Sequence, residues 1–230
     1  MMPRQLAFAL PVRPALGRED FLVAACNADA VAWLDRWPGW PGSILVVHGP
    51  AGSGKSHLAK VWQGASGARE IAPDDLAELS RLGPAPGCSV LLDDADRDLD
   101  AAAEHALLHL VNYVREGGGS LLLTGRDAPA RWPLRLPDLA SRLNAAASAG
   151  IGAPDDPLLA AILSKLFHDR QVQVGAEVIS YLLSRIERSF AAARTVAERL
   201  DAAALGAKRP ITVPLARRVL EELQERTKAR

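Results

Sequence analysis

Residues 44–58 read ILVVHGPAGSGKSHL, a short apolar run that breaks into a glycine loop ending in Lys-Ser. The apolar run at 44–47 is rich in β-branched residues and predicts a buried strand. Apolar residues at Leu58, Val61 and Trp62 follow the loop with helical spacing. A loop of the form G-x-x-x-x-G-K-S between a strand and a helix is the context in which such loops hold phosphate groups. The sequence therefore predicts a binding site for a nucleoside diphosphate or triphosphate.

Each residue type in this loop has a role in phosphate binding. Gly49, Gly52 and Gly54 allow backbone N–H groups to close around phosphate oxygens. Lys55 places a positive charge between the terminal phosphates, and Ser56 offers a hydroxyl to Mg²⁺ at the positive end of the following helix. The other loop residues expected to contact the nucleotide are Ser53 and His57.

The composition favours a soluble protein of the cytoplasm. Hydrophobic residues make up 49% of the 230 residues, which is enough for one main core and a smaller second core. No apolar stretch approaches the roughly 20 residues needed to cross a bilayer, so no membrane contact is expected. The chain has 27 Lys and Arg against 27 Asp and Glu, and its pI is near 7.0. Proteins that rely on a broad phosphate-contacting face are usually much more basic, so this balance disfavours strong direct DNA binding.

The pattern along the chain predicts three regions. Residues 1–16 form a proline-punctuated tail, residues 17–152 a parallel α/β domain that binds nucleotide, and residues 153–230 a small helical lid domain. Strands are expected at 43–47, 69–71, 89–93, 120–124 and 145–149. Helices are expected at 101–116, 156–169, 176–186, 190–205 and 214–228.

A second chemical signal is SVLLDDAD at residues 89–96, an apolar strand that ends in carboxylates. Alone, this ending is ordinary, because carboxylates often begin turns. Downstream of a phosphate loop, it is what a Mg·ATP site requires from a neighbouring strand. We expect Asp93 to hold Mg²⁺ through water, together with the hydroxyl of Ser56, and Asp94 to orient the attacking water.

Several motifs occur in the order in which the AAA+ domain of the DnaA family has them. They are GPAGSGKSHL at 49–58, VLLDDAD at 90–96, LLLTGRDAP at 121–129 and LPDLASRL at 136–143. Because this collinearity is hard to obtain by chance, the chain resembles this family, which includes the bacterial initiator DnaA and its relative Hda, over about residues 5–225. The resemblance implies an AAA+ α/β domain followed by a helical lid. DFLVAACNADA at 20–30 is similar to the family's segment at the adenine pocket, which implies that Asn27 borders that pocket.

The resemblance also implies roles for two arginines. Arg142 matches the family's arginine finger, which stabilises phosphate charge on a neighbouring subunit. Arg188 lies in ERSFAAARTVAERLD, which is similar to the lid segment that carries the second sensor arginine; a surface arginine on an amphipathic helix is the alternative for each. The family's first sensor reads Thr-Ser-Asp or Thr-Gly-Asp, whereas here Thr124 and Gly125 are followed by Arg126. Because a cation replaces the carboxylate, it stays open whether the isolated protein hydrolyses ATP, and whether ADP or ATP is the working ligand.

The stretch QLAFALP at 5–11 is similar to the Gln-Leu peptide with which Hda docks on the β sliding clamp. In an extended peptide ligand, Gln5 can hydrogen-bond at the rim of a pocket while Leu6, Phe8 or Leu10 fill apolar subsites. The alternative is an N-terminal strand or tail in which Gln-Leu occurs by accident.

Within the family, the sequence favours the regulator over the initiator. The chain ends where the lid is expected to end, without the initiator's helix-turn-helix domain, and the short stretch from Lys55 to Asp93 leaves no room for the initiator's DNA-contacting insertion. The resemblance therefore implies an Hda-like regulator that binds ADP or ATP, docks on the clamp and uses Arg142 to stimulate ATP hydrolysis by DnaA, meeting DNA indirectly through the clamp. The alternatives are a self-sufficient AAA+ ATPase resembling a helicase loader, or a DnaA paralogue that binds DNA directly. The oligomeric state stays open.

Overall fold

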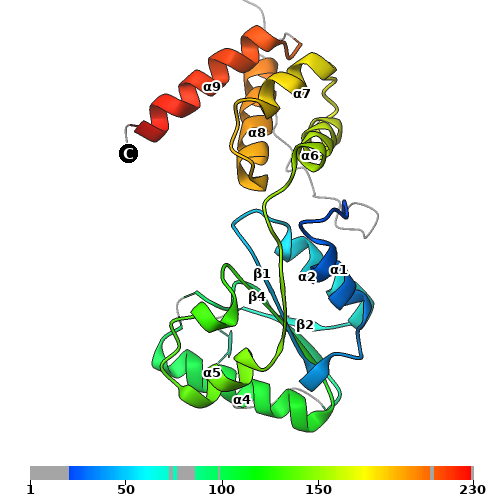
Figure 1. Cartoon of the computed structure of the whole chain (residues 1–230), viewed down its shortest axis with the longest axis vertical. Coiled ribbons are helices and arrows are strands. Elements are labelled where there is room, and N and C mark those ends of the chain that lie inside the picture. Colours follow the sequence, from blue (N-terminus) through cyan, green and yellow to red (C-terminus); the bar gives the residue numbers. More distant parts are fainter. Residues whose placement is uncertain (1–20, 73–74, 77–85, 98, 208–209, 229–230) are drawn as a thin grey trace, which may run out of the picture.

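The computed structural model describes residues 21–72, 75–76, 86–97, 99–207 and 210–228 of the chain. Within these residues, an α/β domain is followed by a helical domain that stands at one end of the molecule (Figure 1). Both the parallel sheet and the C-terminal helices were predicted from the sequence, and both predictions are confirmed.

The sheet is parallel throughout, with the strand order β2-β3-β4-β1-β5. Its strands are β1 (Ile44–His48), β2 (Arg69–Ile71), β3 (Ser89–Leu92), β4 (Ser120–Gly125) and β5 (Ala147–Gly150). β3 and β4 are buried along their whole length, as expected for parallel strands covered on both faces. Val47 lies beside Thr124, and Leu92 lies beside Leu123. The phosphate loop, Asp93 and Thr124 therefore meet at the carboxyl edge of the sheet.

Helices cover the two faces of the sheet, and each face has its own core. On one face pack α1 (Ala28–Asp35) and α2 (Lys55–Ser66), and on the other pack α4 (Ala101–Gly117) and α5 (Pro137–Asn144). Side chains of a strand alternate between its faces. In β1, Leu45 and Val47 accordingly face α1 and α2, whereas Ile44 and Val46 face α4 and α5. The glycine loop leads from the carboxyl edge of the sheet into α2, which covers the opposite face from α5.

The C-terminal helices form a separate core above the carboxyl edge of the sheet (Figure 1). They are α6 (Asp156–Asp169), α7 (Ala176–Leu183), α8 (Phe190–Ala207) and α9 (Val213–Lys228). Asp155 caps α6 by accepting a 2.9 Å hydrogen bond from the backbone N–H of Leu158. The buried members of this core include Leu159, Leu163, Phe167, Leu182 and Leu200. Within the described residues, no helix combines the length and apolarity needed to cross a membrane.

Some element boundaries differ from those predicted by the sequence. α7 ends at Leu183 rather than at 186, because the N–H of Arg185 bonds to the carbonyl of Leu182, three residues back, in place of the four-residue spacing of an α-helix. β5 begins at Ala147 rather than at 145. Ala145 still has helical dihedral angles as the C-cap of α5, so the strand cannot start earlier.

Candidate nucleotide-binding site

The glycine loop between β1 and α2 has a backbone that side chains would disturb. Gly52 has φ 75° and Gly54 has φ 95°, values that L-residues rarely adopt. A Cβ at Gly52 would lie 3.1 Å from the backbone nitrogen of Ala191, which belongs to α8. A Cβ at Gly54 would lie 3.0 Å from the ring of Phe21. The loop is therefore closely approached from two sides, by the lid and by the segment before α1.

Lys55, the first residue of α2, is only 6% exposed and folds onto the loop that precedes it. Its Nζ donates hydrogen bonds to the carbonyl oxygens of Gly49 at 2.8 Å and Pro50 at 3.1 Å. Burial lowers the pKa of this ammonium, while the nearby carboxylates, of which Asp94 acts most strongly, favour its charged form. The charge of Lys55 is thus held inside the loop, where phosphate oxygens would meet it.

A buried hydroxyl in the loop also lacks a partner. Ser53 is 0% exposed, and within the described residues its Oγ accepts and donates no hydrogen bond. Buried polar groups are normally hydrogen-bonded, so an orphan hydroxyl in a phosphate loop fits a site that is completed by a ligand.

Asp93 and Thr124 form a fixed pair at the edge of the sheet. The hydroxyl of Thr124, which is fully buried, donates to Asp93 Oδ1 at 2.5 Å and accepts from the backbone N–H of Asp94 at 2.9 Å. Asp94 has a left-handed backbone, with φ 52°, and its carboxylate lies 3.3 Å from the guanidinium of Arg97. The two carboxylates predicted to act together thus have different partners. Asp93 accepts a hydrogen bond from Thr124 of β4, whereas Asp94 forms an ion pair with Arg97 at the surface.

The oxygen groups at this edge suit Mg²⁺, which takes oxygen ligands and usually retains waters and substrate phosphates in its shell. The hydroxyl of Ser56 and the carboxylate of Asp93 are ligands of that kind. Among the described residues, no cluster of His, Cys, Asp or Glu could hold a metal ion without other ligands. A metal here would depend on the phosphates of the nucleotide.

Two cavities open beside the loop, between the α/β domain and the lid. The smaller, of about 150 Å³, has a mostly apolar wall that includes Phe21, Leu22, Ile162, Leu166 and Phe190, with Asn27 and Lys165 among its polar members. The larger, of about 550 Å³, shares Leu166 with the smaller one, and its lining adds the polar residues Lys55, Ser56, Lys60, Arg170 and Glu198. Both include Gly52, Ser53, Gly54, His57, Asp169 and Arg194. The aromatic side chains of the smaller cavity and the charged side chains around the larger one are groups that suit the base and the phosphates of a nucleotide.

Asn27 is among the residues that line the smaller cavity, and its side chain forms hydrogen bonds with nearby backbone groups. Its Oδ1 accepts from the N–H of Ala24 at 2.8 Å, and its Nδ2 donates to the carbonyl of Leu22 at 2.9 Å. These bonds fix the turn that brings Phe21 and Leu22 into the cavity wall, and the ring of Phe21 meets His57 edge-on at 5.4 Å. The lid residues of the apolar wall were not predicted, because their helices show the same apolar periodicity whether they face a ligand or a core.

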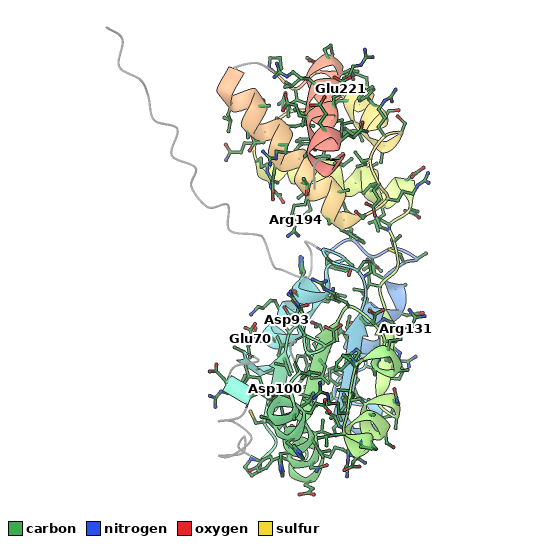
Figure 2. The ribbon with its side chains drawn as sticks, turned by 90° about the vertical axis from the view of Figure 1, so that its left-hand side faces the viewer. Glu70, Asp93, Asp100, Arg131, Arg194 and Glu221 are labelled. Atoms are coloured by element: carbon green, nitrogen blue, oxygen red, sulfur yellow. The ribbon has the colours of Figure 1, made fainter. Side chains whose placement is uncertain are left out.

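Arg188, which the resemblance implied as the second sensor arginine, lines neither cavity. Its guanidinium makes a bidentate contact with Asp156, at 2.6 and 3.0 Å, and its side chain is 64% exposed. The lid arginine that lines both cavities is Arg194. It lies on α8 three residues after Ala191, on the helix face that approaches Gly52. Figure 2 shows Arg194 at the end of α8 that faces the α/β domain, with Asp93 at the facing edge of the sheet.

Arg142 lines neither cavity. It lies on α5, where its Nε donates to Asp138 Oδ1 at 3.0 Å and its side chain is 31% exposed. α5 covers the sheet face opposite α2, so Arg142 and the helix that follows the glycine loop lie on different faces of the sheet. Gln5, Leu6, Phe8 and Leu10, the residues expected to bind a partner, lie outside the described residues.

Comparisons with known proteins agree with this architecture. Residues 156–220 match the family described as Hda, lid domain. The C-terminal helical domain is therefore similar to the Hda lid domain. Domain III of the replication initiation protein DnaA from Thermotoga maritima has a similar structure, with a TM-score of 0.77 and 19% identity over 93% of this chain and 98% of that one. AMPPCP-bound DnaA from Aquifex aeolicus has a TM-score of 0.71 and 18% identity, covering 94% of this chain and 71% of that chain.

More distant AAA+ proteins share the fold as well. A RuvB mutant from Thermotoga maritima matches with a TM-score of 0.70 and 15% identity over 92% of this chain and 73% of that one. An uncharacterized protein from Haemophilus influenzae is 29% identical over 118 residues, or 51% of each chain, so the chain spans about half the length of that curated relative. The predicted fold and the resemblance to DnaA-type AAA+ proteins are confirmed.

Proposed function

We propose that this AAA+ protein is an Hda-like regulator of replication initiation. It binds ADP or ATP with Mg²⁺, docks on the β sliding clamp and stimulates ATP hydrolysis by DnaA, which switches the initiator off. The observation that carries this proposal is the match of residues 156–220 to the Hda lid domain, behind a phosphate loop with its lysine in place. In this account the protein works in the cytoplasm and meets DNA through the clamp.

The described residues supply what a nucleotide needs. The loop amides and Lys55 would hold the phosphates, and the apolar cavity bordered by Asn27 would hold the adenine. Ser56 and Asp93 would hold Mg²⁺, which neutralises phosphate charge when bound. AMPPCP is bound in the DnaA structure from Aquifex aeolicus, which supports an adenine nucleotide as the ligand here.

Arg194 is the arginine that we expect to contact the nucleotide from the lid. Because a hydrogen bond to a charged group contributes about 1.5–3 kcal/mol, Arg194→Ala should weaken nucleotide binding by roughly ten- to a hundredfold. The matched control is Arg188→Ala, which removes an arginine from the same domain but only its surface pair with Asp156. Calorimetric titration with Mg·ADP measures both. Equal affinities of the two variants for Mg·ADP would show that Arg194 does not contact the nucleotide.

Arg142 is proposed to act on a neighbouring DnaA molecule rather than on its own nucleotide. Its position on α5, on the other face of the sheet from α2, supports donation in trans. Asp138, on the same helix, accepts a hydrogen bond from Arg142 Nε and so orients the guanidinium. Within the described residues, this bond leaves the terminal nitrogens of the guanidinium for a partner. An arginine supplied in this way stabilises the charge that develops on the transferring phosphate.

The sequence places clamp attachment in residues 5–10, and that placement rests on the motif alone. If Gln5 and Leu6 anchor a peptide in a clamp pocket, replacing both by alanine should cut clamp affinity sharply, because truncated anchor residues commonly cost more than about 2 kcal/mol. The melting temperature should stay nearly unchanged, because peptide anchors are not core residues. Surface plasmon resonance on immobilised clamp, with a thermal melt of each variant, tests this. Full clamp binding by a chain lacking residues 1–10 would contradict the assignment.

Two other functions make different experimental predictions. A self-sufficient ATPase would turn over ATP alone, and a DnaA paralogue would bind naked DNA tightly with strong salt dependence. The contact of Asp94 with Arg97 supports weak intrinsic turnover, because the carboxylate proposed to orient water is already paired. An assay of ATP hydrolysis by the protein alone, with DNA and with DnaA separates the three. If the protein is a regulator, ATP hydrolysis should be fast when DnaA is present and slow when it is absent.

A further inference from the structure

Glu104 is a buried carboxylate that the nucleotide site does not use. It lies in the first turn of α4 and is 0% exposed. Its oxygens accept hydrogen bonds from the backbone N–H of Arg135, at 3.1 and 2.9 Å, and from that of Leu136, at 2.8 Å. In the described part of the chain, its hydrogen-bond partners are thus backbone amides from a segment more than 30 residues away.

These amides lie at the start of α5, the helix that carries Arg142. Leu136 is the N-cap of α5, and it provides no side-chain cap. Glu104 therefore holds the beginning of α5 from a different helix. Charge-assisted hydrogen bonds of this kind are about twice as strong as neutral ones. A buried carboxylate that lost them would be left unsatisfied, so movement of α5 away from α4 is opposed.

Other contacts restrict α5 and the chain that leads to it. Leu139 and Leu143 are 0% exposed and pack in the core with α4, which fixes the rotation of α5 about its axis. Upstream, Asp96 Oδ2 accepts from the backbone N–H of Arg126 at 2.5 Å, and the indole of Trp132 donates to the carbonyl of Asp127 at 2.8 Å. The segment between β4 and α5 is therefore fixed by hydrogen bonds near both of its ends. Of these, the bonds to Glu104 lie nearest to Arg142 in the sequence.

We infer that Glu104 is a positioning residue for Arg142: it fixes the start of α5 so that the guanidinium meets the phosphate of the partner's nucleotide. This inference rests on the proposed function. Glu104 itself would not touch the nucleotide. A displacement of a catalytic group by about 1 Å can reduce a rate by as much as 100-fold, so loss of this anchor should act on the rate of hydrolysis and not on docking.

The test uses Glu104→Gln in the full chain. Glutamine keeps the size of the side chain but removes its charge and turns an amide –NH₂ toward the backbone donors. The matched control is Val111→Ala, which disturbs the same helix and the same core at a fully buried position away from α5's N-terminus. ATP hydrolysis by DnaA is titrated with each variant in the presence of DNA-loaded clamp. Glu104→Gln should lower the plateau rate by about ten- to a hundredfold with an unchanged half-saturating concentration, whereas Val111→Ala should keep the plateau.

A double-mutant cycle shows whether Glu104 acts through Arg142. In an Arg142→Ala background, Glu104→Gln should reduce the remaining stimulation no further. Amide hydrogen exchange provides a readout without DnaA: residues 135–144 should exchange about tenfold or more faster in Glu104→Gln than in Val111→Ala. Should Glu104→Gln fail to fold, Glu104→Asp, which keeps the charge but withdraws the carboxylate by one methylene, is measured in the same way.

The outcomes separate the inference from the function on which it rests. Three results would overturn the role of Glu104 alone. They are an unchanged plateau rate in Glu104→Gln, an equal loss of stimulation when the same change is made in the Arg142→Ala background, and a change only in the half-saturating concentration. If the parent protein failed to stimulate DnaA, or if Arg142→Ala stimulated it fully, both the proposed function and this inference would be wrong.

Discussion

Arg142→Ala should abolish most of the stimulation of DnaA while leaving nucleotide binding and clamp binding intact. An arginine finger meets charge that develops on the transferring phosphate, and its removal is worth about 10³ to 10⁵ in rate. Because Arg142 lines neither cavity of its own chain, its loss should not change the affinity of this protein for Mg·ADP. Single-turnover hydrolysis of ATP on DnaA measures the first effect, and calorimetry measures the second.

Two further variants make this result specific. Arg142→Lys should restore little stimulation, because lysine lacks the planar fork that binds phosphate oxygens in pairs. Arg115→Ala removes an exposed arginine from the last turn of α4 and should stimulate DnaA like the parent. If Arg142→Ala instead lost its affinity for Mg·ADP, Arg142 would belong to the nucleotide site of its own chain, and this result would contradict the proposed mechanism.

Lys55→Ala should remove most of the stabilisation that nucleotide gives to this protein. At ligand concentrations about 100 times the dissociation constant, bound nucleotide adds about 2.7 kcal/mol to the free energy of unfolding. Lys55 is the buried cation of the loop, and its Nζ is already held at the carbonyls of Gly49 and Pro50. Without it, the phosphates would meet loop amides but no ammonium. Thermal melts with and without Mg·ADP measure the difference.

Arg69→Ala is the matched control for this variant. Arg69 is an exposed cation on β2, and it lines neither cavity beside the loop. It should therefore keep most of the shift in melting temperature that nucleotide produces in the parent. Equal shifts in Lys55→Ala and the parent would show that the loop does not hold phosphate in the predicted manner.

Local sequence patterns were sufficient to predict a glycine loop between a strand and a helix, and most of the sheet. The run at 44–47 is apolar and β-branched, and the glycines of the loop require a backbone that few other residues adopt. Asp93 was predicted because it directly follows an apolar strand. The pairing of β3 with β4 then explains why Thr124 bonds to it. The weakest strand, β5, consists of alanine, serine and glycine, so its boundary depended on where α5 ends.

The features that the sequence did not predict depend on how separate segments approach each other. Arg188 and Arg194 lie close together in sequence, and only the approach of Ala191 to Gly52 shows which arginine lies at the cavities. Glu104 resembles any acidic residue near a helix start. Its role is visible only because its hydrogen-bond partners, Arg135 and Leu136, come from the start of another helix.

The most direct test of the proposed function is the rate of hydrolysis of ATP preloaded on DnaA. The reaction is followed with DnaA alone, with DNA-loaded clamp, with this protein, and with both together. The Hda-like regulator predicts rapid conversion of DnaA-bound ATP to ADP when this protein and the loaded clamp are both present, and slow conversion in the other three reactions. A rate with both components that does not exceed that of DnaA alone would contradict the account.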